Sequence, residues 1–211
     1  MNEKLKRALS GSVYVAVMWI GTSYSETSFK LLFAVLGLVC MYEIFKLRKG
    51  KTKILAFLYV LIPFILMQVF GMRDSNFPFD PSFILLMFVL TWTFDTFAYL
   101  VGVKFGKHKI IPTVSPKKSW EGFAGGFIFT IIAAYLTASY FLEIKLNQAI
   151  VISLFLPFTA TVGDFTESYY KRKAGVKDSG NFIPGHGGML DRMDAFMFTI
   201  PVLYIYLSLI K

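Results

Sequence analysis

Long apolar runs are the feature that most constrains what this chain can fold into. Seven stretches, separated by short polar segments, each approach the roughly 20 residues that an α-helix needs to cross the hydrocarbon core of a bilayer. Of the 211 residues, 55% are hydrophobic, whereas soluble domains are ordinarily about 45–50% apolar. The runs are continuous rather than alternating, which argues against a transmembrane β-barrel. The sequence therefore predicts an all-α, polytopic integral membrane protein.

We expect seven spans in a single membrane domain over residues 1–211, with N-terminal helices in 1–103 and chemistry-bearing loops and helices in 104–211. The expected spans are 10–24, 28–46, 53–72, 82–103, 121–142, 148–168 and 192–210. The basic start and short first span also fit a secretory signal peptide. Because six more spans follow, we interpret the first as a retained anchor. The single cysteine, Cys40, lies in an apolar run, so no disulfide framework is expected.

Basic residues fall on alternate connecting segments. All but four of the 22 Lys and Arg residues lie before the first expected span or after the second, fourth and sixth. The exceptions are Lys30, Arg73, Lys145 and Lys211. Because cytoplasmic segments are enriched in Lys and Arg, the N-terminus is predicted to be cytoplasmic and the C-terminus outside. This rule and attraction to anionic membrane lipids explain the net charge of +9, so no nucleic-acid partner is expected.

The loop 104–121, "KFGKHKIIPTVSPKKSWE", is rich in lysine. Ser115 and Pro116 suit the start of the next helix, because serine caps free N–H groups and proline is tolerated in a first turn. Lys117 and Lys118 beside that helix end would attract an anion, phosphate above all. A basic, membrane-facing loop with a conventional cap is the alternative interpretation.

The span before this loop ends in "WTFDTFAYLVG", which places Asp95 inside an apolar helix. A carboxylate there is costly unless it faces protein, water or a cation, so a functional role is the first hypothesis. A structural polar contact between helices is the alternative.

The loop 164–194 is the richest in polar chemistry. Helical spacing puts a carboxylate near the lipid and cations near water on one stripe of the sixth span. Its members are Asp164, Ser168, Lys171 and Arg172. Asp191 and Asp194, three positions apart, form a second carboxylate pair where the last span begins.

Three glycines in this loop, Gly185, Gly187 and Gly188, would let backbone N–H groups approach an anion closely. A flexible turn is the alternative for the glycines, and a surface histidine is the alternative for His186. Two histidines and one distant cysteine are too few for a zinc site.

Carboxylates from two helices with cations nearby suit phosphoryl chemistry on a magnesium-bound nucleotide. Mg²⁺ takes hard oxygen ligands, usually one or two carboxylates together with phosphates and water. Cations neutralise the charge that develops on the transferring group.

Two blocks of the sequence resemble a known family. The pattern S-x2-K-R-x4-K-D-x-G-x2-I-P-G-H-G-G-x2-D-R-x-D over 168–194 resembles the signature of phosphatidate cytidylyltransferases, also called CDP-diacylglycerol synthases. The segment "DTFAYLVGVKFGKHKIIPTVSPKKSWEG" is similar to that family's second block. A pattern with so many fixed positions is far more specific than a lone glycine motif.

The resemblance implies that CTP and phosphatidic acid give CDP-diacylglycerol and pyrophosphate, with Mg²⁺; a second cation is left open. It also implies an intramembrane helical fold in the cell (inner) membrane, an active site facing the cytoplasm and a homodimer. Family members carry further apolar segments before the "DTFAYLVG" helix, so we expect fewer N-terminal spans here.

The resemblance also implies roles for individual residues. The expected metal ligands are Asp164 and Asp191, with Asp194 in support. The residues expected to act in catalysis are Asp164, Lys171, Arg172, Asp191 and Arg192. The residues expected to bind substrate are Ser115, Lys117, Lys118, Ser168, Lys177, Asp178, Gly185, His186, Gly187 and Gly188.

Four rival interpretations follow from the same composition. A transporter would usually place its acids near mid-bilayer within inverted repeats, but here no repeat is found and the acids cluster at one face. A CTP-dependent lipid kinase would differ in its products. A CDP-alcohol phosphotransferase would carry a D-G-x2-A-R-type pattern, which this sequence lacks. A purely structural membrane protein has no need for so many costly charges.

Overall fold

The computed structural model describes residues 3–48, 53–70, 79–183, 185 and 187–210. Within them the regular structure is helical, with two isolated β-bridges and no strand, which confirms the all-α prediction. The helices are α1 (Glu3–Ser23), α2 (Glu26–Leu47), α3 (Ile54–Phe70), α4 (Ser82–Phe105), α5 (Trp120–Tyr140), α6 (Leu146–Lys173) and α7 (Leu190–Leu209).

Five helices are long and apolar enough to cross a membrane: α2, α4, α5, α6 and α7. The apolar parts of α1 and α3 are shorter, at Leu9–Ser23 and Ile54–Phe70. Each expected span thus corresponds to a helix, and the five long ones mark the chain as a membrane protein. The count of seven spans stays a prediction.

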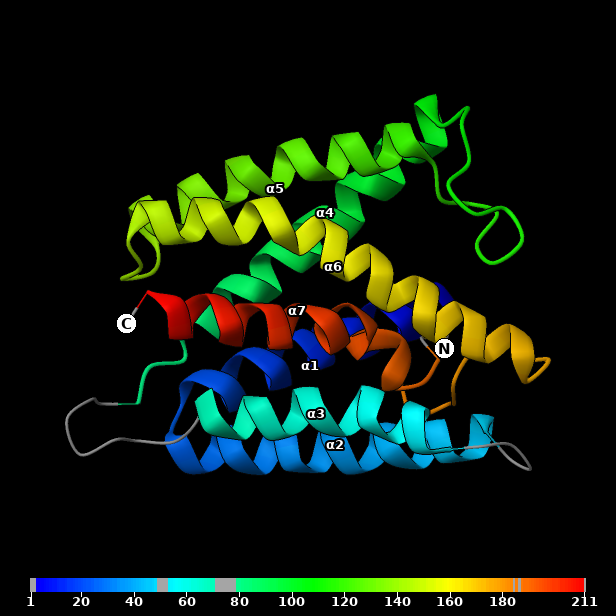
Figure 1. Ribbon diagram of the computed structural model, residues 1–211, viewed down its shortest axis with the longest axis horizontal. Coiled ribbons are helices and arrows are strands. Elements are labelled where there is room, and N and C mark those ends of the chain that lie inside the picture. The colour runs from blue at the N-terminus through cyan, green and yellow to red at the C-terminus, as the bar shows by residue number, and fades with distance from the viewer. Residues whose placement is uncertain (1–2, 49–52, 71–78, 184, 186, 211) are drawn as a thin grey trace.

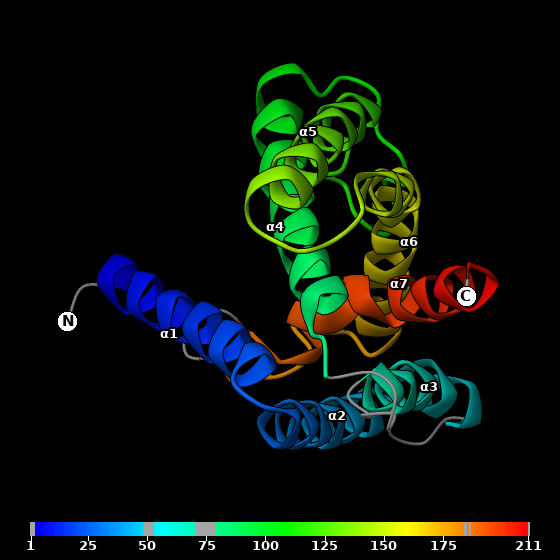
Figure 2. The ribbon, with the colours of Figure 1, turned by 90° about the vertical axis from the view of Figure 1, so that its left-hand side faces the viewer.

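Helix α7 lies in the middle of the bundle and packs against α6, α3 and α2. In Figure 1, α6 and α5 lie on one side of α7 and α3 and α2 on the other, while α4 crosses behind. Seen from the side in Figure 2, α1 stands apart from this stack and makes contacts with α2 and α4.

Glycines set the closest helix contacts, as small residues do in membrane bundles. A Cβ on Gly126 of α5 would lie 2.8 Å from the carbonyl oxygen of Phe94 in α4. A Cβ on Gly163 of α6 would collide with the carbonyl oxygen of Asp194 in α7. The second contact brings the polar ends of α6 and α7 together.

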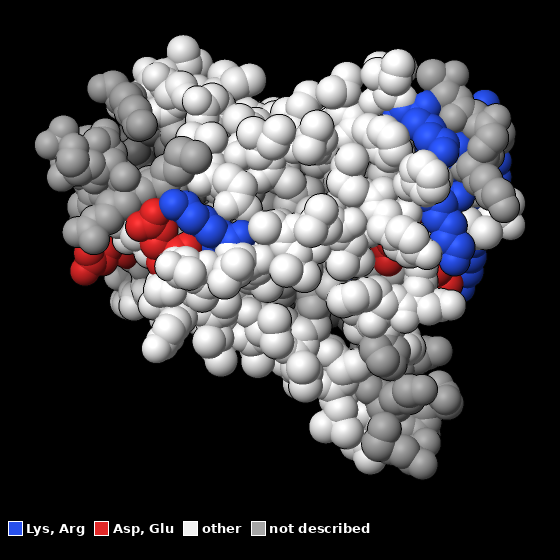
Figure 3. All heavy atoms as spheres, turned by 90° about the horizontal axis from the view of Figure 1, so that it is seen from below, with Lys and Arg blue, Asp and Glu red and all other residues white. Residues whose placement is uncertain are grey.

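The segments that the charge pattern assigned to one side of the membrane lie at one end of the bundle. The N-terminus, the end of α2, the 106–119 loop and the 174–189 loop are all at the right of Figure 1. Lys and Arg side chains gather at that end in the view from below (Figure 3).

The start of α5 lies one residue before the expected span 121–142. The helix begins at Trp120, and the side chain of Ser119 caps it by accepting a hydrogen bond from the Gly122 amide at 3.2 Å. Ser115 and Pro116, which we expected to suit a helix start, lie in the turns before this cap, so the capping serine is Ser119 and not Ser115.

Candidate active site

Three carboxylates meet where α6 and α7 are in close contact. Asp164 and Glu167, three positions apart, share a face of α6, and Asp194 projects from α7. One oxygen of each lies within 4.8 Å of the others. We call these three residues the carboxylate cluster.

Glu167 is the buried member of the cluster, with a side chain that is 0% exposed. Its Oε2 lies 2.5 Å from Nζ of Lys171, at ion-pair distance. Among the described residues, however, neither Glu167 oxygen accepts a hydrogen bond of regular geometry. Lys171 donates instead to Oδ1 of Asp191 at 2.7 Å, so one ammonium group lies between two carboxylates.

The carboxylate of Asp191 is hydrogen-bonded to other groups of the chain. Besides Lys171 at Oδ1, its Oδ2 accepts hydrogen bonds from the backbone N–H of Ser179 at 2.9 Å and of Gly188 at 2.7 Å. The Ser179 hydroxyl lies 3.1 Å from the same oxygen. Since a carboxylate has about four lone-pair positions, these donors take up most of its capacity. The sequence led us to expect Asp164 and Asp191 as main metal ligands, but the structure groups Asp164 with Glu167 and Asp194.

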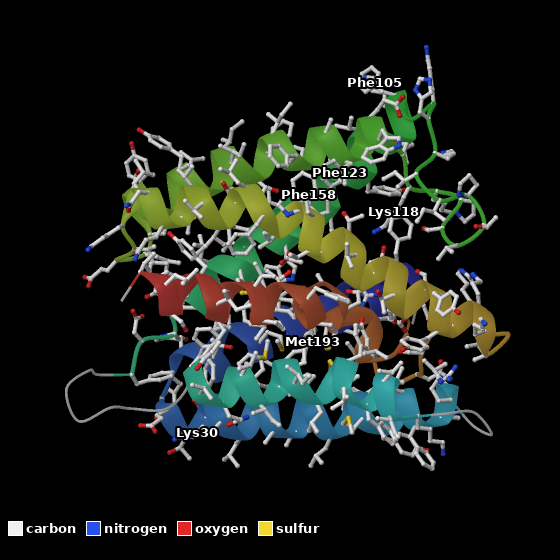
Figure 4. All side chains as sticks on the ribbon, in the orientation of Figure 1. Lys30, Phe105, Lys118, Phe123, Phe158 and Met193 are labelled. Atoms are coloured by element: carbon white, nitrogen blue, oxygen red, sulfur yellow. The ribbon has the colours of Figure 1, made fainter. Side chains whose placement is uncertain are left out.

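The carboxylate cluster suits a hard divalent cation. Its donors are oxygens, as Mg²⁺ prefers. Within the described part of the chain neither buried oxygen of Glu167 accepts a hydrogen bond of regular geometry, although Oε2 is ion-paired with Lys171. Lys118 forms an ion pair with Asp164 and lies beside α6 in Figure 4. Three carboxylates therefore face two ammonium groups. The negative charge of the cluster exceeds the positive charge beside it, and a bound cation would offset the difference.

A cavity of about 610 Å³ opens on one side of the cluster, a volume typical of small-molecule sites. It brings together Asp164 and three predicted substrate-binding residues, Ser115, Lys117 and Lys118. Its apolar wall includes Phe123 of α5, whose ring packs 5.1 Å from that of Phe158 in α6 (Figure 4).

A smaller cavity of about 270 Å³ lies on the other side, between α1, α4 and α7. Its lining includes Asp191, Arg192 and Asp194, together with Tyr14 of α1. Asp95 of α4 lines both cavities. The carboxylate that the sequence marked as costly within an apolar helix thus borders both cavities.

Other predicted residues lie apart from the cluster. Arg172 is exposed and donates to the Val176 carbonyl at 3.0 Å in the turn after α6. Lys177 and Asp178 are exposed in the 174–189 loop, whereas Ser168 is buried on α6.

The glycine-rich stretch has the backbone that glycine permits. Gly185 and Gly187 have φ of 79° and 87°, a region that other L-residues rarely adopt. Pro184 and His186 lie outside the described residues, so the role expected for His186 stays a prediction.

Two buried glutamates were missed by the sequence analysis. Glu167 lies on the same stripe as Asp164 and Lys171, and Glu43 lies in α2, 4% exposed. The rule that singled out Asp95, that a carboxylate within an apolar helix needs a partner or a function, applies equally to both.

Comparison with known proteins identifies the family of this chain. The cytidylyltransferase family matches residues 51–210, a range that contains every residue of the carboxylate cluster and both the 106–119 and the 174–189 loops. The chain therefore belongs to the cytidylyltransferase family.

Several curated relatives carry the name phosphatidate cytidylyltransferase. One from Thermotoga maritima is 46% identical over 133 residues, 60% of this chain and 49% of the relative. One from Staphylococcus aureus strain COL is 46% identical over 127 residues, 59% and 48% of the two chains. One from Staphylococcus saprophyticus is 35% identical over 191 residues, 89% and 72% of the two chains. The matches to the first two span about half the length of those relatives.

Proposed function

We propose that this chain is a phosphatidate cytidylyltransferase, which makes CDP-diacylglycerol and pyrophosphate from CTP and phosphatidic acid. The observation that carries the proposal is the carboxylate cluster, partly buried between α6 and α7 and bordered by a cavity with lysines in its lining. Family membership and the names of the relatives support the same reaction.

In the proposed reaction, a phosphate oxygen of phosphatidic acid attacks the α-phosphorus of CTP. The bond from that phosphorus to the oxygen bridging it to the β-phosphate breaks, and pyrophosphate leaves. The lipid phosphate has a second pKa of about 6, by analogy with other phosphomonoesters, so it is already a competent nucleophile near neutral pH. The chain then has to bind, align and neutralise two anions rather than supply a strong base.

We assign the metal to Asp164, Glu167 and Asp194. Mg²⁺ held there would neutralise charge on the triphosphate. Asp191, which we expected to be a ligand, is proposed to orient Lys171 toward the cluster, because its oxygens already accept hydrogen bonds from Lys171 and the loop.

We assign the triphosphate to the larger cavity. Lys117 and Lys118 line it and would bind phosphate oxygens there, with Ser115 beside them. Arg192, on the smaller cavity, is proposed to bind phosphate from the other side of the cluster. The remaining predicted contacts stay proposals: Arg172, Ser168, Lys177, Asp178, Gly185, His186, Gly187 and Gly188.

The orientation in the membrane follows from the substrates. CTP arrives from the cytosol while the acyl chains stay in lipid, so the site has to lie where the two meet. The basic loops, the N-terminus and the polar ends of α6 and α7 share one end of the bundle (Figure 1). We propose that this end faces the cytoplasm, that all seven helices span the cell membrane and that the protein forms a homodimer.

The test is incubation of the purified protein with CTP labelled at its α-phosphate, phosphatidic acid and Mg²⁺. Label in a CDP-lipid, with release of one pyrophosphate per CDP-lipid, is the expected result, and Asp164→Asn should abolish it. With γ-labelled CTP and a lipid alcohol, transfer of label to the lipid would identify a kinase instead. Substrate uptake into vesicles without CTP would identify a transporter.

A further inference from the structure

We propose that Glu43 of α2 is a positioning residue that holds the start of α7 and the 174–189 loop in the arrangement the site needs. Glu43 lies outside the residues that the family matches and comes from a helix with no other role in the site. Its effect on turnover rests on the proposed function, but its effect on the loop does not.

The carboxylate of Glu43 caps α7 from another helix. Oε1 accepts a hydrogen bond from the Met189 amide at 3.0 Å, and Oε2 accepts one from the Leu190 amide at 2.8 Å. Amides at a helix start lack partners within the helix, and the N-cap residue of α7 makes no side-chain capping bond. A carboxylate is also electrostatically favoured at this end. Glu43 therefore supplies the cap that the local sequence lacks.

Two glycines of the 174–189 loop leave the space that Glu43 occupies. A Cβ on Gly180 would lie 2.5 Å from Oε1 of Glu43, and one on Gly188 would lie 2.6 Å from Oε2. Both distances are shorter than real side chains tolerate. We expected Gly188 to allow approach of a phosphate; in the structure it allows approach of this buried carboxylate.

Ser179 connects Glu43 to the site. Its hydroxyl lies 2.9 Å from Oε2 of Glu43 and 3.1 Å from Oδ2 of Asp191, and its one proton can be donated to either. The amides of Ser179 and Gly188, which bind Asp191, belong to the same loop. Moving this loop away from Glu43 would remove donors from Asp191, whose other oxygen orients Lys171 beside Glu167.

Glu43→Gln tests this role, because an amide offers one acceptor oxygen where two are used. Partners that orient metal-site residues typically affect activity by about 10–100-fold, so we expect kcat per folded protein to fall by that factor with the KM for CTP unchanged. Glu26→Gln is the matched control, since Glu26 lies at the other end of α2 in an ion pair with Lys30. A variant that loses folded protein but keeps the wild-type kcat would overturn the positioning role.

Two further variants extend the test, and the first of them keeps the proposal testable if Glu43→Gln does not fold. Gly180→Ala places a Cβ against Oε1 of Glu43, with no other side chain or backbone atom as close, and should lower kcat in the same direction. Ser179→Ala combined with Glu43→Gln should cost less than the sum of the single effects, because the two side chains act through one contact. Wild-type kcat in Gly180→Ala would count against the role of Glu43, and strict additivity in the double variant would count against the connection through Ser179.

Amide hydrogen exchange separates this inference from the proposed reaction. In Glu43→Gln, peptides covering the start of α7 should exchange faster than in wild type and in Glu26→Gln, whether or not CTP is a substrate. Faster exchange in a protein without cytidylyl transfer would refute the reaction and retain the role of Glu43. Unchanged exchange together with unchanged kcat would refute the role of Glu43 and retain the reaction.

Discussion

Two loops at the same end of the bundle are each held by a glutamate that accepts hydrogen bonds from backbone amides. The two glutamates lie in different surroundings. Glu121 binds the 106–119 loop at the surface, accepting from the amide of Lys107 at 3.1 Å and from the amide of His108 at 3.2 Å. Glu43 binds the 174–189 loop from within the protein, where it is 4% exposed. Water can replace the first set of contacts but not the second, because a buried polar group has no other partner.

The difference indicates that the two loops have different roles in the site. The surface-held loop carries lysines into the lining of the larger cavity, where an incoming substrate would meet them. The loop held from within fixes Asp191 and, through it, Lys171 beside the carboxylate cluster. Breaking the buried arrangement should therefore lower kcat, and breaking the surface arrangement should mainly change substrate affinity.

The largest effect is expected at the cluster that both loops serve. Glu167→Gln removes a buried carboxylate charge in an almost isosteric change, and we expect kcat to fall by about 10³-fold, as for loss of a preorganised electrostatic group. The Mg²⁺ dependence of turnover is the second measurement, and its midpoint should move to higher concentration. Asp80→Asn, a carboxylate at the far end of the bundle, should leave both unchanged. Wild-type turnover in Glu167→Gln would remove this residue from the metal site.

The next largest effect is expected where the inner loop meets the cluster. Asp191→Asn keeps one acceptor oxygen but loses the charge that orients Lys171, so we expect kcat to fall by about 10–100-fold. The midpoint for Mg²⁺ should stay near that of the wild type if Asp191 orients Lys171. A large shift in that midpoint, equal to that of Glu167→Gln, would show that Asp191 is a metal ligand after all.

A smaller effect, of a different kind, is expected in the outer loop. Lys118→Ala removes a cation from the lining of the larger cavity, and we expect the KM for CTP to rise by about tenfold, the loss of one charge-assisted contact. Lys46→Ala, an exposed lysine of α2, is the control for general surface charge. Equal changes in the two variants would mean that Lys118 contributes only to the field of the whole surface.

The sequence was sufficient for the helices and for the convergence of acids from two spans. Continuous apolar runs determine the former, and helical spacing placed Asp164 and Asp194 at facing helix ends. The sequence was not sufficient to predict which groups each acid contacts. Lys171 contacts both Glu167 and Asp191, and the choice between metal ligand and orienting residue depends on loop geometry that helical spacing does not encode. Glu43 contacts Ser179 across 136 positions of sequence, a separation that no local pattern spans.

The smallest effect is expected at the surface anchor of the outer loop, and it is the sharpest test of the comparison. Glu121 accepts from Nδ1 of His108 at 2.6 Å, but the His108 side chain is 80% exposed, and pairs so exposed contribute little because water and salt compete for both groups. Glu121→Gln retains one acceptor for the loop amides, so we expect kcat within about twofold of wild type and a KM for CTP that responds slightly more to salt. The measurement is steady-state kinetics at low and high ionic strength, beside Glu43→Gln under the same conditions. If Glu121→Gln lowered kcat as much as Glu43→Gln, burial would not distinguish the two anchors, and the outer loop would have to be as rigidly positioned as the inner one.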